Sequence, residues 1–191
     1  MFVNQGMAAT SHPTLQAITE AAAEAAAASY AWLLASEGDG LAVVSATGPD
    51  VGATVGRALA AGEGSAGYVL SSGQPLALQL QPDDASPWAA RHPLLGRVPE
   101  TILSVPCPGS SGTHGVLELL DKTGGAFSFD DVEVVSLLGS IAGAALDDGV
   151  LHGPPVTAPD ELGHELHQLF VDDPPEYARI AAVLQALLSH G

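Results

Sequence analysis

Two pairs of short apolar runs, each joined by a glycine-rich turn, constrain the fold of this chain more than any other feature. The first pair, residues 30–35 and 41–46, surrounds the sequence SEGDG, and the second pair, residues 101–106 and 114–120, surrounds PGSSG. Apolar runs of this length around such turns are typical of β-hairpins. The chain is therefore expected to contain an antiparallel sheet.

Helical patterns stand on both sides of these hairpins. An alanine-rich segment follows Pro13 and predicts a helix over residues 14–28, because alanine has the highest intrinsic helix propensity. Ser128, followed three residues later by Asp131, is a capping pattern that predicts the start of a helix over 129–147. We expect the buried stripe of this second helix to contain Val134, Leu137, Leu138, Ile141 and Ala145.

Shorter elements lie between the hairpins. Residues 51–61 fit either a strand or a short helix, residues 65–72 fit a helix that Gly73 ends, and residues 76–80 fit a strand. This order of elements predicts an α+β domain with a central antiparallel sheet and helices on its faces.

Composition divides the chain into four parts. Residues 1–13 lack periodicity and are expected to be a flexible N-terminus, 14–150 form the folded domain, and the Gly- and Pro-rich stretch 151–159 is a linker. Residues 160–191 are expected to form a pair of amphipathic helices. Their apolar stripes must be buried, either on the domain itself or on a partner or second copy.

The balance of charges limits the partners. The chain has 5 Lys and Arg residues against 22 Asp and Glu residues, which gives a net charge of −17. Nucleic acid and anionic membranes attract basic surfaces, so neither is an expected partner. No apolar run reaches the roughly 18 residues of a membrane span, and no signal-peptide pattern is visible, so a cytoplasmic protein is expected. The single cysteine, Cys107, excludes internal disulfides and zinc sites built on two or more thiolates.

Several motifs in residues 14–150 together resemble the GAF domain, a family with a GAF/PAS-like α+β fold. The motifs, in chain order, are GEGSAGYV at 62–69, SGQPL at 72–76, SVPCP at 104–108, GVLEL at 115–119 and FSFDD at 127–131. The resemblance implies a small-molecule sensor or regulatory module. Ligands in this family include cyclic nucleotides, haem, bilins, amino acids and inorganic ions, and the fold alone does not select among them.

The resemblance implies that a ligand would lie between the sheet and a covering segment, here residues 81–100. Trp88, Arg91 and His92 are the candidate ligand-binding residues of this segment, because an aromatic platform beside a cation suits a planar or anionic ligand. Together with Arg97, Arg91 predicts a locally positive lid for a small anion. The alternative is that Trp88 packs on the core and Arg91 pairs with a nearby carboxylate.

Two strand positions could line the same cavity. Ser104 and Glu118 are the candidates, and Glu118 alternates with Leu117 and should therefore face the other side of the sheet. A buried glutamate normally needs a partner. The alternative is that Glu118 faces solvent.

Catalytic and metal chemistry have weaker support. Cys107 could be reactive if His114 lay across the hairpin, but a small apolar filler is the favoured interpretation. GAF-type free methionine sulfoxide reductases use more than one cysteine, and the position of Cys107 does not resemble a bilin attachment motif. His164 and His167 have a spacing that can support adventitious metal binding, although a solvated helix face is favoured. Haem ligation by His92 or His114 is a minor alternative.

The sequence as a whole predicts a non-catalytic sensory or regulatory domain that binds a small molecule under residues 81–100. The sequence does not identify a cofactor. Signals would pass through helix-mediated protein contacts. The main alternative is an interaction or dimerisation protein without a ligand, whose interface uses residues 14–28, 129–147 and 160–189. A redox or haem-linked sensor or enzyme is the third possibility.

Overall fold

The computed structural model describes residues 12–60, 62–81, 88 and 90–147, together with residues 168, 171, 174 and 175. The chain divides into two compact units, residues 1–151 and 152–191. All the elements described below belong to the first unit. The predicted linker, and almost all of the predicted C-terminal helices, lie outside the described residues.

The described strands form one six-stranded antiparallel sheet in the order β3-β2-β1-β6-β5-β4, which confirms the predicted fold class. The two predicted hairpins, β1–β2 and β5–β6, lie side by side because β6 pairs with β1. The described residues of the segment predicted at 51–61 form a 3-10 turn and a short edge strand. The bounds are β1 (Ala28–Glu37), β2 (Gly40–Thr47), η1 (Val51–Ala53), β3 (Ala58–Leu59), β4 (Leu76–Gln79), β5 (Thr101–Gly109) and β6 (Gly112–Lys122).

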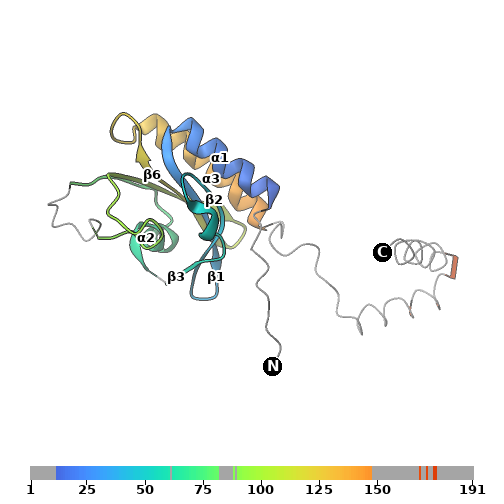
Figure 1. Cartoon of the computed structure of the whole chain (residues 1–191). Coiled ribbons are helices and arrows are strands. Elements are labelled where there is room, and N and C mark those ends of the chain that lie inside the picture. The colour runs from blue at the N-terminus through green and yellow to red at the C-terminus, as the bar shows by residue number, and fades with distance from the viewer. Residues whose placement is uncertain are drawn as a thin grey trace, which may run out of the picture. The chain divides into compact units, whose positions relative to one another are not determined.

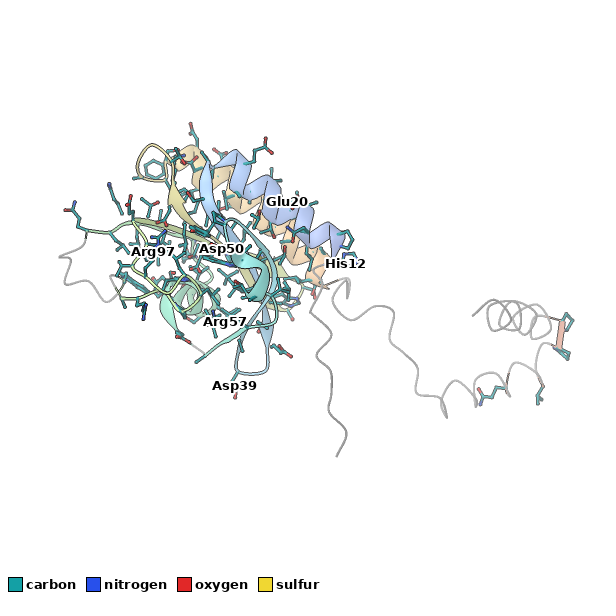
Figure 2. The ribbon with its side chains drawn as sticks, in the orientation of Figure 1. His12, Glu20, Asp39, Asp50, Arg57 and Arg97 are labelled. Carbon is teal, nitrogen blue, oxygen red and sulfur yellow. The ribbon has the colours of Figure 1, made fainter. Side chains whose placement is uncertain are left out.

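Helices cover both faces of the sheet. Helices α1 (Pro13–Ala25) and α3 (Phe129–Asp147) lie side by side on one face, and α2 (Gly64–Ser72) lies on the other (Figure 1). Helix α1 includes Pro13 and is shorter at its end than the predicted 14–28, because Ala27 takes a left-handed φ of 50° and turns the chain into β1. Gly73, with a φ of 65°, ends α2 as predicted.

The buried face of α3 is not the predicted stripe. Val134, Leu137 and Ile141 are 45%, 64% and 49% exposed, whereas Leu138 and Ala145 pack partly against the core. The residues of α3 that are buried against the sheet are Asp131, Val135, Gly139, Ala142 and Gly143. Small residues take this face because the helix backbone rests almost directly on β5. A Cβ atom at Gly139 or Gly143 would lie 2.8 Å or 2.0 Å from a carbonyl oxygen of that strand.

Alternation along the strands produces one core on each face of the sheet. The sheet residues of the core under α1 and α3 include Leu33, Leu103, Val105, Leu117 and Leu119. The sheet residues of the core under α2 include Trp32, Leu34, Ile102, Val116 and Leu120. Glu118 lies between two residues of the first set and therefore faces the α2 side, as the alternation predicts.

Candidate functional site

Three buried side chains form a row across the α2 side of the sheet. Trp32 of β1 and Ser104 of β5 each pair directly with Glu118 of β6. Directly opposed residues of antiparallel strands project to the same side, with Cβ atoms about 5 Å apart. The exposed fraction is 1% for Trp32 and 0% for the other two. A glutamate therefore lies in the interior, between an indole and a hydroxyl.

The carboxylate of Glu118 has a hydrogen-bond partner on each oxygen. Ser65, in the first turn of α2, donates to Oε1 over 2.5 Å, and Ser104 donates to the same atom over 2.9 Å. The Nε2 atom of His92, from the covering segment, lies 2.9 Å from Oε2. Three separate parts of the chain thus meet at one buried acid, which satisfies the rule that buried polar groups are paired.

These partners keep Glu118 ionised. Burial by itself raises the pKa of Glu118, but the charge and hydrogen bond of His92, with the hydrogen bonds of Ser65 and Ser104, outweigh it. The net pKa of Glu118 lies below its ordinary value of 4.5. The site therefore holds a negative charge at neutral pH.

His92 is held by a compact turn of the covering segment, residues 92–97, which we call the His92 turn. The backbone N–H of His92 donates to the carbonyl oxygen of Arg97 over 2.9 Å, and the N–H of Gly96 donates back to His92 over 2.8 Å. A guanidinium nitrogen of Arg57 donates to the carbonyl oxygen of Pro93 over 3.2 Å. The turn is thus closed on itself and tied to the loop before β3.

The backbone also fixes the orientation of the imidazole. The N–H groups of Leu94 and Leu95 both donate to Nδ1 of His92, each over 3.3 Å. In the neutral imidazole, Nδ1 accepts these bonds with its lone pair, so the ring proton lies on Nε2 and is donated to Glu118. The hydrogen bond to Glu118 is thus present even when the imidazole is neutral.

Aromatic stacking supports the other faces of this site. The ring of His92 stacks on Trp32 with centroids 5.4 Å apart, and Trp32 stacks on Tyr30 at 5.8 Å. The guanidinium of Arg97 lies 5.9 Å from the Tyr30 centroid and is 2.5 Å from a carboxylate oxygen of Asp121. Within the described part of the chain, the buried indole N–H of Trp32 has no hydrogen-bond acceptor.

A small cavity lies beside His92 among the described residues of the covering segment. This cavity, of about 40 Å³, is lined by residues that include Ser65, Trp88, Arg91 and His92. Ligand pockets usually measure about 300–1,000 Å³. Among the described residues, the ring of His92 fills the space over Trp32 and beside the carboxylate of Glu118.

The predicted site residues have separate roles. His92, Ser104 and Glu118 are brought together, whereas Trp88 packs edge-on against Tyr68 with centroids 5.5 Å apart. Arg91 is exposed, and its Nε donates to the carbonyl oxygen of Gly96.

The structure does not support the expected positive lid for an anion. Arg97 is paired with Asp121, and the charge buried beneath the covering segment is the carboxylate of Glu118. Ser65 and Trp32 were not predicted as site residues. The GEGS sequence that opens α2 and the alternation of β1 are the signals that could have indicated them.

The residues proposed for other chemistry are engaged elsewhere. Cys107 has an exposed fraction of 0%, and burial raises the pKa of its thiol to about 12. His114 bonds Asp147 through Nδ1. The predicted pair His164 and His167 lies outside the described residues. In the part of the chain that the structure describes, no three His, Cys, Asp or Glu residues gather as a metal site would require, and no helix has the length and apolar character to span a membrane.

An antiparallel sheet with two helices on one face, and a short helix and a covering segment on the other, defines an open-sheet α+β domain. A profile of the GAF domain family matches residues 8–147, and the chain belongs to this family. The chain matches none of the curated proteins with which it was compared.

Solved structures share this fold. The GAF domain from an Acinetobacter phosphoenolpyruvate-protein phosphotransferase is similar with a TM-score of 0.61 and 17% identity, over 80% of this chain and 90% of that one. The A. aeolicus nlh2 GAF domain in an inactive state is similar with a TM-score of 0.55 and 19% identity, over 70% of this chain and 83% of that one. Type II free methionine-R-sulfoxide reductase from Thermoplasma acidophilum is similar with a TM-score of 0.57 and 13% identity, over 74% of this chain and 92% of that one. At these identities the likeness shows the fold alone.

Proposed function

We propose that this chain is a sensory or regulatory domain whose ligand pocket, itself without a catalytic role, is closed by its own His92. The observation that carries the proposal is the set of bonds around the imidazole. A planar ring stacks on Trp32 and gives an N–H to the buried carboxylate of Glu118. These are the interactions that a small bound heterocycle would make, so His92 stands where the ligand would lie.

The same contacts indicate the class of ligand. Glu118 is ionised and buried, so it disfavours anions and favours a group that donates N–H bonds. The face of Trp32 favours a planar ring or a cation, and its unpartnered N–H favours a ligand that also carries an acceptor. We therefore propose a small planar nitrogen heterocycle, neutral or cationic, that displaces His92 and opens the His92 turn in a cytoplasmic protein.

A panel of matched heterocycles tests this proposal on the full chain. Each pair consists of a planar ring with a free N–H and its N-methylated counterpart, and binding is followed by the melting temperature. We expect the N–H member of at least one pair to raise the melting temperature, because only it can satisfy Glu118, and we expect Glu118→Gln to weaken the effect. Equal shifts within every pair, or no shifts at all, would contradict the proposal.

A second candidate is an interaction domain that needs no ligand. It is supported by the exposed apolar residues Val134, Leu137 and Ile141, which lie at positions i, i+3 and i+7 of α3. We propose a second copy of this chain as the occupant of this face. Sedimentation should then show a dimer that Leu137→Glu disrupts, with Ser140→Ala as the exposed control on the same helix. A wild-type protein that is monomeric at all concentrations would exclude this candidate.

Thiol-based catalysis is not part of the proposal. The likeness to a free methionine-R-sulfoxide reductase at 13% identity concerns the fold. The Cys107 thiol is buried with a pKa of about 12, so it lacks the thiolate that nucleophilic sulfur chemistry requires.

A further inference from the structure

A second polar relay lies at the tip of the β5–β6 hairpin, outside the site around Glu118. The hydroxyl oxygen of Ser111 is 2.9 Å from Nε2 of His114. The opposite ring nitrogen, Nδ1, is 2.6 Å from Oδ1 of Asp147, at the end of α3. The other carboxylate oxygen of Asp147 accepts the backbone N–H of Ser110 over 2.6 Å. A hydroxyl, an imidazole and a carboxylate are therefore linked in series.

The carboxylate of Asp147 determines which ring nitrogen of His114 carries the proton. The pKa of Asp147 is lowered below its ordinary value of 3.8, chiefly because the carboxylate accepts the backbone N–H of Ser110. This bond, a side-chain hydrogen bond with Ser110 and the charge of His114 together outweigh the effect of desolvation. An ionised carboxylate can only accept, so in neutral His114 the proton lies on Nδ1. The lone pair of Nε2 then faces the hydroxyl of Ser111 and can take its proton.

Matched spacings of α3 and β5 bring Asp147 to the hairpin. Gly139 packs on the carbonyl of Pro106 and Gly143 packs on that of Pro108, and Asp147 follows at the same interval of four residues. Four helical residues advance about 6.0 Å. Two strand residues advance about 6.6 Å, so every fourth residue of α3 lies beside every second residue of β5. The next contact in the series is that of the Asp147 carboxylate with the amide of Ser110, two residues beyond Pro108 and just past the end of β5.

The hairpin backbone also places the imidazole. A Cβ atom at Gly109 would lie 2.5 Å from Nδ1 of His114, so the ring packs flat against a position that only glycine leaves open. The side chains of His114 and Asp147 are 26% and 25% exposed, and Ser111 is exposed. The ring is thus oriented while the hydroxyl is accessible to a substrate.

We propose that Ser111, His114 and Asp147 form a catalytic site with a serine nucleophile that hydrolyses small activated carboxylic esters. The Oγ atom of Ser111 forms a bond to the ester carbonyl carbon as its proton passes to Nε2 of His114. The C–O bond to the alcohol then breaks, and His114 returns the proton to the departing alkoxide. Water attacks the acyl-serine with His114 as base, which releases the acid and restores Ser111.

The role of each residue follows from the series. Ser111 is the nucleophile and His114 is the general base, and Asp147 positions the ring and stabilises its protonated form. General-base assistance contributes about 10²–10⁴-fold to such a step. The hydroxyl should therefore react with an activated ester or phosphonyl fluoride far faster than an ordinary exposed serine.

Covalent labelling of the full chain tests the proposal. The protein is incubated with a fluorophosphonate, and the adduct is followed by intact mass and mapped to a residue. We expect one adduct on Ser111, with labelling at least tenfold slower in Ser111→Ala and His114→Gln and partly slowed in Asp147→Asn. Ser140→Ala removes an exposed hydroxyl of α3 that donates to the carbonyl oxygen of Ser136, and this variant should label as the wild type does.

A steady-state assay with p-nitrophenyl acetate separates catalysis from labelling. We expect Ser111→Ala to lose turnover while it keeps the melting temperature of the wild type, because the residue is exposed in a turn. Absence of an adduct, an adduct on another residue, or equal rates in Ser111→Ala and Ser140→Ala would overturn the proposal. None of these results depends on the Glu118 site.

Discussion

His92 and Trp32 stack with their ring planes 12° apart, although 59 positions of sequence separate the two residues. The same imidazole is 2.9 Å from the buried carboxylate of Glu118. A side chain of the covering segment thus makes, inside the domain, both a stacking contact and a charge-assisted hydrogen bond. We interpret this arrangement as the closed state of a ligand pocket, and the following predictions test its parts.

The carboxylate of Glu118 should stabilise the protein in a pH-dependent way. Its pKa is lower in the folded chain than the ordinary value of 4.5, so the unfolded chain binds more protons below that value. The stabilisation is complete above about pH 4.5 and is lost as the pH falls through the folded pKa. We expect Glu118→Gln to cost about 3 kcal/mol at neutral pH.

Urea unfolding of wild type and Glu118→Gln between pH 3 and pH 7 measures this effect. The difference in the free energy of unfolding between the two proteins should narrow as the pH falls from 4.5 through the folded pKa of Glu118, because both carry an uncharged side chain at this position once Glu118 is protonated. A difference that stays constant over the whole range would show that the charge of Glu118 does not contribute.

The two serines should act together on the same oxygen. Ser65 and Ser104 both donate to Oε1 of Glu118, and hydrogen bonds to a charged group are each worth about 1.5–3 kcal/mol. We expect each alanine substitution to lower the free energy of unfolding by about 2 kcal/mol. The remaining serine bonds more strongly when its neighbour is lost. The double variant should therefore lower the free energy of unfolding by more than the sum of the two single variants. Ser140→Ala is the control, and simple additivity would contradict the shared acceptor.

The contact of α3 with β5 should make one glycine irreplaceable. Alanine normally stabilises a helix interior by about 1 kcal/mol relative to glycine. A Cβ atom at Gly143 would lie 2.0 Å from the carbonyl oxygen of Pro108, so Gly143→Ala should instead destabilise the protein by about 2 kcal/mol. Thermal unfolding measures the sign, and Ser140→Ala on the exposed side of α3 should be neutral or stabilising. A stabilising Gly143→Ala would show that α3 does not rest on the strand.

The sequence predicts the sheet and its covering helices because hairpin turns, caps and alternation are local signals. Ser128 and Asp131 bond each other as the capping pattern indicates, and Glu118 faces away from Leu117. The buried face of α3 was predicted wrongly because periodicity weighs large apolar residues, whereas Gly139 and Gly143 form the actual contact.

The contacts of the site depend on long-range pairing and could be predicted only in part. Ser104 and Glu118 were candidates because each lies on a strand near the covering segment. Their neighbour Trp32 belongs to another hairpin, and only the register of β1 with β6 brings it beside Glu118. The spacing of residues within one strand does not predict which residues of another strand lie opposite them. Similarly, the sequence of the covering segment makes His92 a candidate but does not predict that its ring stacks on Trp32 beside Glu118.

The thiol of Cys107 should be unreactive in the folded protein. Burial raises its pKa to about 12, so almost none of it is thiolate near neutral pH. We expect a disulfide reagent such as DTNB at pH 8 to react slowly with the native chain and fully after denaturation in guanidinium. Rapid stoichiometric reaction of the native chain would favour the redox alternative instead.

The most direct test of the closed-pocket account is rescue of His92→Ala by imidazole. Removing the side chain leaves space between Trp32 and Glu118, and free imidazole can restore both the stacking and the N–H bond. We predict that imidazole raises the melting temperature of His92→Ala in a saturable way and that N-methylimidazole does so less. The wild type should respond less than His92→Ala, because its own imidazole competes for the site. The same response in His92→Ala and wild type, or none in either, would contradict the claim that His92 occupies a ligand site.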